Sequence, residues 1–386
     1  MNKELKKRKV LIVTGSRGEY GYIRPIIHLM SESNLLVPKV LATNMHMLPE
    51  FGNSVKEIEK DNIFVEHKVY MTLAGYTNVT MTKSLGVFML SFADILQDRA
   101  PDIILLAGDR GEQLIAAIVG AHLNIPVAHI QAGELSGNVD GMSRHAIARF
   151  THIHFAANED AQARLIKMGE EPFRVFKVGA PQIDEFIHGK IETKETVAAK
   201  FSLDLTQPVI LVVQHSVTEQ ASFAEQQMTI TMKAIIELGY QAVVIYPNND
   251  AGSVAIQRCI QQARRAHIKV ERNVSREMYA GLMNTVDVIV GNSSSGILEA
   301  PSFGLPAVNI GRRQEGRFQG KNVINVKEHE QVAIVSAIQK ALSPEFRAFL
   351  KNMENPYGDG HSSKRIVDIL ENVKIDEKLL FKKITY

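Results

Sequence analysis

The sequence is poor in cysteine, in net charge and in long apolar runs. Its 386 residues include one cysteine, Cys259, which leaves no partner for an internal disulfide and fits a reducing compartment. The formal net charge is only +2, which argues against nucleic acid or an anionic membrane as the main partner. No run approaches the roughly 20 apolar residues that a transmembrane helix needs. These absences predict a soluble, cytoplasmic protein.

Two families of motif are also missing. No strand-to-helix turn has the G-x-G-x-x-G spacing of a dinucleotide site, and no H-x-x-E-H or clustered Cys/His spacing indicates a metal. We therefore expect no cofactor and no metal. A small anionic ligand remains compatible with the composition, because it needs only a few local cations.

What the sequence does contain is a regular alternation of apolar strands and helical segments. Most of the strand candidates are continuous apolar runs, which is typical of parallel strands covered by helices on both faces. This pattern predicts an α/β protein with two doubly wound, Rossmann-like halves. The predicted strands are residues 9–14, 36–43, 63–70, 102–108, 125–130, 152–157 and 173–179 in the first half, and 208–214, 241–247, 267–271, 286–292, 306–310 and 322–326 in the second.

The apolar runs stop over residues 181–207, which are polar and end before Pro208. We therefore predict an N-terminal domain of residues 1–183 and a C-terminal domain of residues 184–361. The remaining segment, 362–386, holds a helix that we expect to return to the N-terminal domain. Sheets of this kind bind ligands at the carboxyl ends of their strands, so a cleft between the two domains is expected.

Three motifs follow strands of the first half. TGSRGEYG, residues 14–21, opens a helix and adds Arg17, a forked cation suited to phosphate; an ordinary turn is the alternative. LLAGDRGEQ places Asp109 and Arg110 directly after a buried strand, where burial can tune an acid for proton transfer; a structural role is equally open. Glu112, in the next helical turn, is interpreted as a complement to the helix dipole.

The third motif, QAGELSGNVDGMSRHAI at residues 131–147, has more ionisable groups than a turn requires. Glu134 follows the strand that ends at Ile130, and Asp140 stands shortly before a helix with Arg144 and His145. We predict that Asp109 and Glu134, from neighbouring strand ends, face one ligand carbon from two sides. A helix cap is the competing role for Asp140, and Arg144 and His145 have the alternative of anchoring the helix to the loop.

Two motifs follow strands of the second half. QHSVTEQ places His215 at a strand end, where its ring is able to donate to phosphate; a structural histidine is the alternative. GNSSSGILEAPSFGLP is the most specific signal, because three serines and a glycine at a helix start converge on one anion-sized space, whereas a cap needs one serine. Glu299 lies about one helical turn further on, placed to accept from a ribose diol.

In this order, these stretches resemble the hydrolysing UDP-N-acetylglucosamine 2-epimerases over about residues 8–370. The strongest pieces are GDR, GELSGNVDGMSRHAI, YPNNDAGS and GNSSSG. The resemblance implies the two-domain GT-B fold and conversion of UDP-GlcNAc and water to ManNAc and UDP, for sialic acid or related nonulosonic acid synthesis. It also implies UDP-sugar and UDP as ligands, and a homodimer or homotetramer.

The resemblance assigns roles to the residues of these motifs. A carboxylate removes the weakly acidic C2 proton only as the C1–O bond to UDP breaks, so stabilisation of the leaving group is essential. Under this interpretation the catalytic residues are Asp109, Glu134, Asp140 and His215. The substrate-binding residues are Arg17, Arg110, Arg144, His145, Asn249, Asp250, Ser293, Ser294, Ser295, Gly296, Glu299 and Arg313.

The sequence departs from the family pattern in three places: HSVT stands for the common HPVT, GSRGEYG for GTRAEYG, and the third concerns the acids. The family usually has a second acid directly after Asp140, whereas this chain has Gly141. The nearest alternative activity is that of a relative acting on UDP-2,4-diacetamido-2,4,6-trideoxyglucose in legionaminic acid synthesis. The activity of a non-hydrolysing UDP-GlcNAc 2-epimerase and the role of a catalytically idle UDP-sugar sensor also stay open.

Overall fold

A computed structural model describes residues 7–49, 53–74, 78–135, 139–247 and 252–385. The chain divides into two compact units. Unit 1 comprises Met1–Glu185 and Gly360–Tyr386, and unit 2 comprises Phe186–Asp359.

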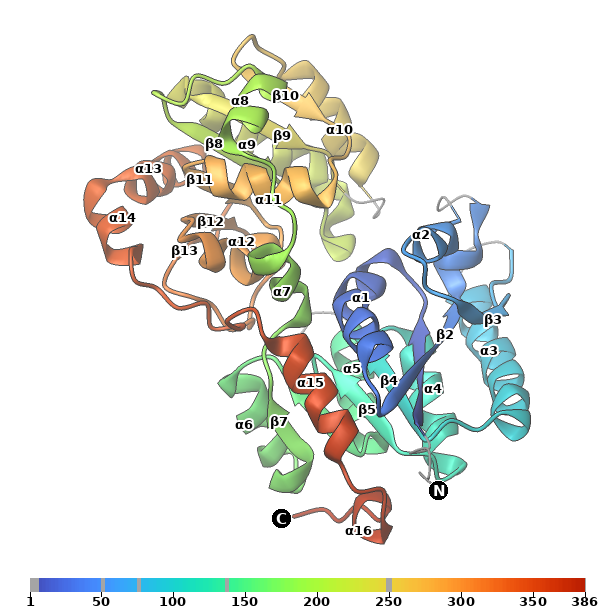
Figure 1. The fold of residues 1–386 in the computed structure, drawn as a ribbon. Coiled ribbons are helices and arrows are strands. Elements are labelled where there is room, and N and C mark those ends of the chain that lie inside the picture. The colour runs from blue at the N-terminus through green and yellow to red at the C-terminus, as the bar shows by residue number, and fades with distance from the viewer. Residues whose placement is uncertain (1–6, 50–52, 75–77, 136–138, 248–251, 386) are drawn as a thin grey trace. The chain divides into compact units, whose positions relative to one another are not determined.

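Unit 1 is built on a seven-stranded, wholly parallel sheet with the order β3-β2-β1-β4-β5-β6-β7 (Figure 1). Its strands are β1 (Arg8–Thr14), β2 (Leu36–Thr43), β3 (Val65–Val69), β4 (Ile103–Ala107), β5 (Val127–Ile130), β6 (Ile153–Ala156) and β7 (Val175–Lys177). Its α-helices are α1 (Arg17–Glu32), α2 (Val55–Lys60), α3 (Asn78–Asp98), α4 (Gly111–His122), α5 (Val139–Phe150), α6 (Glu159–Lys167), α15 (Ser362–Asn372) and α16 (Glu377–Leu380), with 3-10 turns η1 (Asn44–Met47) and η3 (Pro172–Arg174).

The continuous apolar runs of unit 1 form strands because helices cover both faces of the sheet. Val10 and Ile12 of β1 pack into the core shared with α1 and α15, whereas Leu11 and Val13 pack into a second core with α3 and α4. Successive side chains of a strand point to opposite faces, so each face needs its own apolar set. Here both sets come from one uninterrupted run.

Helix α3 departs in part from the expectation that no segment is long and apolar enough to form a transmembrane helix. Within the described residues, Val79–Asp98 is one helix long and apolar enough to cross a membrane by length and composition, with a mean hydropathy of 1.4. Its Phe88, Phe92 and Leu96 are buried in the core with α4, whereas Leu90 is exposed. One face of α3 therefore packs on the sheet as a core helix does.

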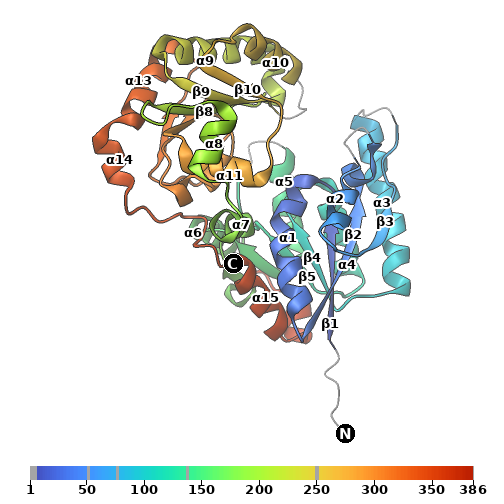
Figure 2. The same ribbon diagram turned by 45° about the horizontal axis from the view of Figure 1, so that its top comes forward.

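The last helices of the chain belong to unit 1, although nearly 175 residues separate them from the rest of it. Helix α15 lies against α1, with Ile366, Val367 and Leu370 in their shared core (Figure 2). Its start is fixed by Asp184, whose carboxylate accepts from the backbone N–H groups of Ser362 (3.0 Å) and Ser363 (2.6 Å).

The tail after α15 is held by one buried and one partly buried cation. Arg174 is fully buried, and its guanidinium donates to the backbone carbonyls of Lys378, Leu379 and Phe381. Lys382 donates to Glu170 at 2.7 Å and to the carbonyl of Ala148 at 2.8 Å, near the end of α5. A cation at the carboxyl end of a helix is stabilising because the last carbonyls there lack helical donors.

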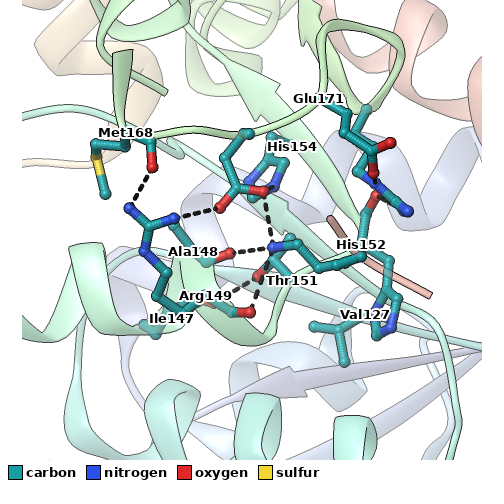
Figure 3. A network of polar contacts seen from close by, with 12 residues as sticks. Val127, Ile147, Ala148, Arg149, Thr151, His152, His154, Met168 and Glu171 are labelled. Atoms are coloured by element: carbon teal, nitrogen blue, oxygen red, sulfur yellow. Dashed lines mark hydrogen bonds and ion pairs between the residues drawn. The ribbon is translucent and has the colours of Figure 1, made fainter. Parts of the chain in front are cut away.

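Glu170 is the centre of this network, which Figure 3 shows from close by. Besides Lys382, it accepts from His154 (3.0 Å) and Arg149 (3.3 Å), and Arg149 also donates to the carbonyl of Met168 (2.6 Å). Burial opposes ionisation of Glu170, but the donors His154 and Lys382 lower its pKa to about 2. Glu170 is therefore a saturated, ionised carboxylate, and we call Glu170, His154, Arg149 and Lys382 the Glu170 cluster.

Unit 2 is built on a six-stranded, wholly parallel sheet with the order β10-β9-β8-β11-β12-β13. Its strands are β8 (Val209–Val213), β9 (Gln241–Ile245), β10 (Ile268–Glu271), β11 (Val288–Gly291), β12 (Ala307–Ile310) and β13 (Val323–Val326). Helix α7 (Pro181–His188) spans the division between the units. The other elements are α8 (Lys194–Phe201), η4 (Thr218–Phe223), α9 (Ala224–Leu238), α10 (Ser253–Gln262), α11 (Arg276–Thr285), α12 (Ser295–Leu298), η5 (Ala300–Phe303), α13 (Gln331–Leu342) and α14 (Pro344–Leu350).

The predicted fold class, two doubly wound Rossmann-like halves, is confirmed, and all thirteen predicted strands form. In each sheet the strand order reverses once, between β1 and β4 in unit 1 and between β8 and β11 in unit 2. The crevice beside such a reversal, at the carboxyl ends of the strands, is where open α/β sheets bind ligands. The motifs singled out in the sequence follow β1, β4, β5, β8, β9 and β11, at the reversals or next to them.

Candidate functional site

Unit 1 has a set of candidate site residues where β1 and β4 end side by side. Ser16 caps α1, its hydroxyl accepting from the N–H of Glu19 at 3.4 Å, and Arg17 is the first residue of the helix. The Arg17 guanidinium is about half exposed and forms a 2.5 Å ion pair with Glu57 of α2. The loop therefore presents a cation at the edge of unit 1.

Asp109 and Arg110 follow β4, as the sequence predicted. Asp109 is about 20% exposed and forms an ion pair with the buried Arg144 of α5. Arg110 precedes the first residue of α4, and its Nε donates to Glu112 at 2.9 Å. A second donor to the same Glu112 oxygen is the side-chain amide of Asn44, also at 2.9 Å.

This geometry extends the expected role of Glu112. The sequence suggested only a complement to the dipole of α4, whereas the carboxylate is 2% exposed and joins two loops through Arg110 and Asn44. A substituent on Gly15 would lie 2.1 Å from its Oε1, so Glu112 also packs against the β1–α1 loop. Glu112 thus positions Arg110 at this edge.

Glu134 stands in the loop after β5, the strand next to β4. It is 4% exposed, and the loop before it is tightly wound, with φ of +60° at Gln131 and +78° at Gly133. Only glycine fits at 133, because a Cβ there would lie 2.4 Å from the carbonyl oxygen of Ala161. Asp109 and Glu134 therefore come from adjacent parallel strands, on the same edge of the sheet.

Helix α5 carries three further predicted residues. Arg144 is buried and links the two acidic loops, because it pairs with Asp109 and donates to the carbonyl of Gln131 at 2.8 Å. His145 is half-buried, and burial, with the charge of Arg144, lowers its pKa. Asp140 lies in the first turn of α5, and its side chain is outside the described part of the structure.

Unit 2 has a separate set of candidate site residues where β8 and β11 end. Asn292 links the two loops, because its Oδ1 accepts from the N–H of His215 (2.7 Å) and its Nδ2 donates to the His215 carbonyl (2.8 Å). Arg313, after β12, donates to the carbonyl of Asn292 at 3.2 Å. Burial, aided by the charge of Arg313, lowers the pKa of His215 to about 3. The imidazole is thus neutral at pH 7, and the positive charge here belongs to Arg313.

Residues 293–295 after β11, which we call the serine loop, depend on close backbone contact between β11 and β8. Gly291 has φ of +134°, and a Cβ there would lie 2.1 Å from the carbonyl oxygen of Val213. The chain then runs through Ser293, whose hydroxyl accepts from the N–H of Ser295 at 3.3 Å. Ser294 directly precedes α12, and Gly296 lies within that helix. Serine hydroxyls and backbone N–H groups therefore gather at the end of β11.

Glu299 lies just after α12 and is buried. Burial raises its pKa, and the charges of Arg276 and Arg317 oppose that rise. Tyr279 of α11, which the sequence analysis missed, hydrogen-bonds to Ser295 and Ser293, although burial raises the pKa of its hydroxyl. No local pattern marks Tyr279 or Arg276, because they come from another helix and reach the serine loop only in the folded unit.

The structure thus groups the predicted residues into two sets. Unit 1 gathers Arg17, Asp109, Arg110, Glu134, Arg144 and His145, and unit 2 gathers His215, Ser293, Ser294, Ser295, Gly296, Glu299 and Arg313. Asn249 and Asp250 lie outside the described residues. The first set offers two carboxyl groups suited to proton transfer, and the second offers neutral donors and arginine suited to a phosphate-bearing ligand.

Comparisons with known proteins give the family of the chain. A family model described as UDP-N-acetylglucosamine 2-epimerase matches residues 29–371. The chain is 35% identical, over 97% of its length and 98% of the relative's, to a UDP-N,N'-diacetylbacillosamine 2-epimerase (hydrolyzing) of Legionella pneumophila. It is 32% identical, over 87% of its length and 88% of the relative's, to a UDP-N-acetylglucosamine 2-epimerase of Neisseria meningitidis serogroup B.

The fold is also that of a solved structure. The crystal structure of UDP-GlcNAc 2-epimerase from Neisseria meningitidis bound to UDP-GlcNAc superposes with a TM-score of 0.79 at 22% identity, covering 94% of this chain and 99% of that one. The two Rossmann-like units are therefore those of a GT-B protein. Together with the match to the family model, these likenesses show that the chain belongs to the UDP-N-acetylglucosamine 2-epimerase family, a family of UDP-sugar 2-epimerases.

Proposed function

We propose that the protein is a hydrolysing UDP-sugar 2-epimerase, which converts a UDP-2-acetamido sugar and water to UDP and the free C2 epimer. The observation that carries the proposal is the pair of acids on adjacent strand ends, Asp109 and Glu134, in a family of UDP-sugar 2-epimerases. Two carboxyl groups suit a reaction in which one proton leaves C2 and another returns to its opposite face.

The reaction begins with loss of UDP. As the C1–O bond breaks, positive charge at C1 makes the C2 proton acidic enough for a carboxylate to remove, and the bonding electrons leave with the diphosphate. The negative charge on UDP is met by Arg313, by the neutral His215 and by the hydroxyl and N–H groups of the serine loop. The product of this step is a glycal-like intermediate.

Hydration completes the reaction. The second acid protonates C2 from the other face while water adds at C1 and gives its proton to that same acid, and the first acid releases the proton taken from C2 to solvent. Arg144 supports this chemistry by fixing Asp109 and by holding the loop that leads to Glu134. Since Gly141 replaces the second acid that the resemblance leads one to expect after Asp140, we assign the proton transfers to Asp109 and Glu134.

UDP-N,N'-diacetylbacillosamine is the substrate that we favour over UDP-GlcNAc. The support is the 35% identity to the Legionella pneumophila relative, which extends over nearly all of both chains. UDP-GlcNAc is the second candidate, because the Neisseria meningitidis relative named for it is 32% identical. Both sugars carry an acetamido group on C2, the carbon that is epimerised.

The test is an incubation of the purified protein with each UDP-sugar in deuterated water. We expect free UDP and a C2-inverted sugar with deuterium at C2, with a higher kcat/KM for UDP-N,N'-diacetylbacillosamine. Release of UDP without label at C2 would exclude the elimination route. An intact, epimerised UDP-sugar would instead identify a non-hydrolysing enzyme, and tight binding of UDP without turnover would identify a sensor.

A further inference from the structure

Glu19 lies between the two loops of unit 1 that carry the candidate cations and acids. It is in the first turn of α1 and is 3% exposed, and its Oε2 accepts from the N–H of Gly15 at 2.5 Å. On the other side its stem faces the β4–α4 loop, because a Cβ on Gly108 would lie 3.8 Å from Glu19 Cγ. Glu19 therefore contacts the loop of Arg17 and the loop of Asp109 at once.

The second carboxyl oxygen of Glu19 differs from the first. Among the described residues, Oε1 is buried without a hydrogen-bond partner, and the same is true of the side-chain oxygen of Gln113, which interacts with the Glu19 carboxyl. The Gln113 amide nitrogen donates one N–H to the carbonyl of Val13 at 3.2 Å, and the hydrogen bond of its side chain to the Glu19 carboxyl lowers the pKa of Glu19. Glu19 Oε1 and the Gln113 oxygen are nevertheless both buried acceptors without a partner among the described residues.

A proton on Glu19 resolves this conflict. A buried carboxylate oxygen without a donor costs free energy, whereas a protonated Oε1 is able to donate to the Gln113 oxygen and satisfy both groups. The neighbouring Glu112 is the one that takes the charge, because Arg110 and Asn44 both donate to it at 2.9 Å. Two adjacent buried carboxyl groups do not both ionise readily.

The electrostatic surroundings point in the same direction. Burial and then the negative charge of Glu112 raise the pKa of Glu19 well above its ordinary value, although the charge of Arg110 and the hydrogen bonds from Gly15 and Gln113 oppose the rise. His46 of η1 also lies near Glu112, but burial lowers its pKa to about 4, so its ring is neutral. Arg17 is turned toward Glu57.

We propose that Glu19 is held as an uncharged carboxylic acid that donates to Gln113 and positions the Arg17 loop against the Asp109–Arg110 loop. Its effect on turnover rests on the proposed function. When Glu19 is neutral, the buried carboxyl groups of Glu19 and Glu112 together carry one negative charge instead of two. This charge lies behind Arg17 and Arg110. Ionisation of Glu19 would weaken the attraction of this edge for an anionic UDP-sugar and would leave two buried acceptors unsatisfied.

The first test is direct and needs no substrate. Glu19→Gln preserves the proposed bonding, because its carbonyl is able to accept from Gly15 while its amide donates to Gln113. We expect the infrared spectrum of the wild-type protein at neutral pH to contain the carbonyl band of a protonated carboxylic acid. That band should lose intensity in Glu19→Gln and stay unchanged in Glu59→Gln, a control at an exposed carboxylate of α2. A wild-type protein without the band overturns the proposal.

The pH dependence of stability is the second test. A carboxyl whose pKa is raised on folding stabilises the native state at low pH, and this contribution is lost as pH rises above the ordinary glutamate value through the folded one. We therefore expect the melting temperature of Glu19→Gln to gain on that of the wild type between about pH 5 and about pH 9. A constant difference between the two proteins across this range contradicts the proposal.

Kinetics provide the third measurement. Glu19→Gln should keep its kcat at neutral pH and show a smaller rise of KM at alkaline pH than the wild type, whereas Glu19→Ala should lose activity at every pH. A steeper alkaline rise in Glu19→Gln overturns the proposal. If neither UDP-sugar is turned over, the proposed function fails, while the infrared band and the stability profile still decide the state of Glu19.

Discussion

Glu19 and Glu170 are both buried carboxyl groups of unit 1, but the donors that surround them differ. Glu170 accepts from His154, Arg149 and Lys382, and its pKa is lowered to about 2 (Figure 3). Glu19 accepts from one backbone N–H, and its other oxygen has no partner in the described part of the chain. Burial acts on both in the same way, so the supply of donors decides which of them is charged.

The regions around Glu170 and Glu19 also differ in the segments of the chain that they connect. The Glu170 cluster joins the end of α5 to the C-terminal tail, and its cations are committed to backbone carbonyls as well as to the carboxylate. Glu19 lies among the loops that present Arg17, Asp109 and Arg110. A carboxylate with a full set of donors, such as Glu170, fixes segments of the chain. A carboxyl with too few donors, such as Glu19, retains a proton, and losing that proton changes the charge of the neighbouring site.

Replacing the acids at the strand ends should give the largest effect. Asp109→Asn and Glu134→Gln are each expected to lower kcat by roughly 10²–10⁴-fold, since a positioned acid or base contributes about that much. The affinity for UDP, measured by calorimetry, should change little. Asp102→Asn is the control, because this carboxylate precedes β4 at the opposite end and accepts from the N–H of Lys9. Full activity in both variants would refute the assignment.

Breaking the Glu170 cluster should mainly affect stability. Lys382→Met keeps the apolar stem but removes the ammonium group from a buried carboxylate, which typically costs about 3 kcal/mol. Urea unfolding of the variant and of Lys383→Met, an exposed neighbour, gives the comparison. Equal stabilities of the two variants would show that the cluster does not hold the tail.

Acid should weaken unit 1 through His152. Its Nδ1 accepts from the N–H of Val127 at 3.1 Å, and burial lowers its pKa to about 4. Below the ordinary histidine pKa of about 6.5, the unfolded state therefore binds more protons than the folded state. The free energy of unfolding falls by up to about 3 kcal/mol as pH drops from about 6.5 to about 4. His152→Asn keeps an acceptor without the titration and should flatten this part of the profile. An unchanged slope would exclude His152 as its source.

The smallest effect is expected at the serine loop of unit 2. Ser295→Ala removes one hydroxyl that contacts Tyr279, and we expect UDP to bind about tenfold more weakly, in line with one hydrogen bond to a charged group. Calorimetric titration with UDP measures this. Ser336→Ala, at an exposed position of α13, should bind as the wild type does. Unaltered binding in Ser295→Ala would remove this serine from the proposed UDP site.

Much of the fold was readable from the sequence because its strongest signal is local. Runs such as the one over Val10–Val13 are apolar at every position, and only a strand covered on both faces needs that pattern. The positions of Asp109, Glu134 and His215 were also predictable, since each follows such a run. Their activities and the choice between two UDP-sugars remain predictions.

The sequence by itself determined the two parallel sheets and which polar residues end their strands, because both follow from hydrophobic pattern and chain order. Only the tertiary structure decided the partners of those residues. Asn44 joins Glu112, Tyr279 reaches the serine loop, and Lys382 caps a helix more than 230 residues earlier. Charge states depend on such contacts, since a buried carboxyl keeps or loses its proton according to donors that come from distant parts of the chain.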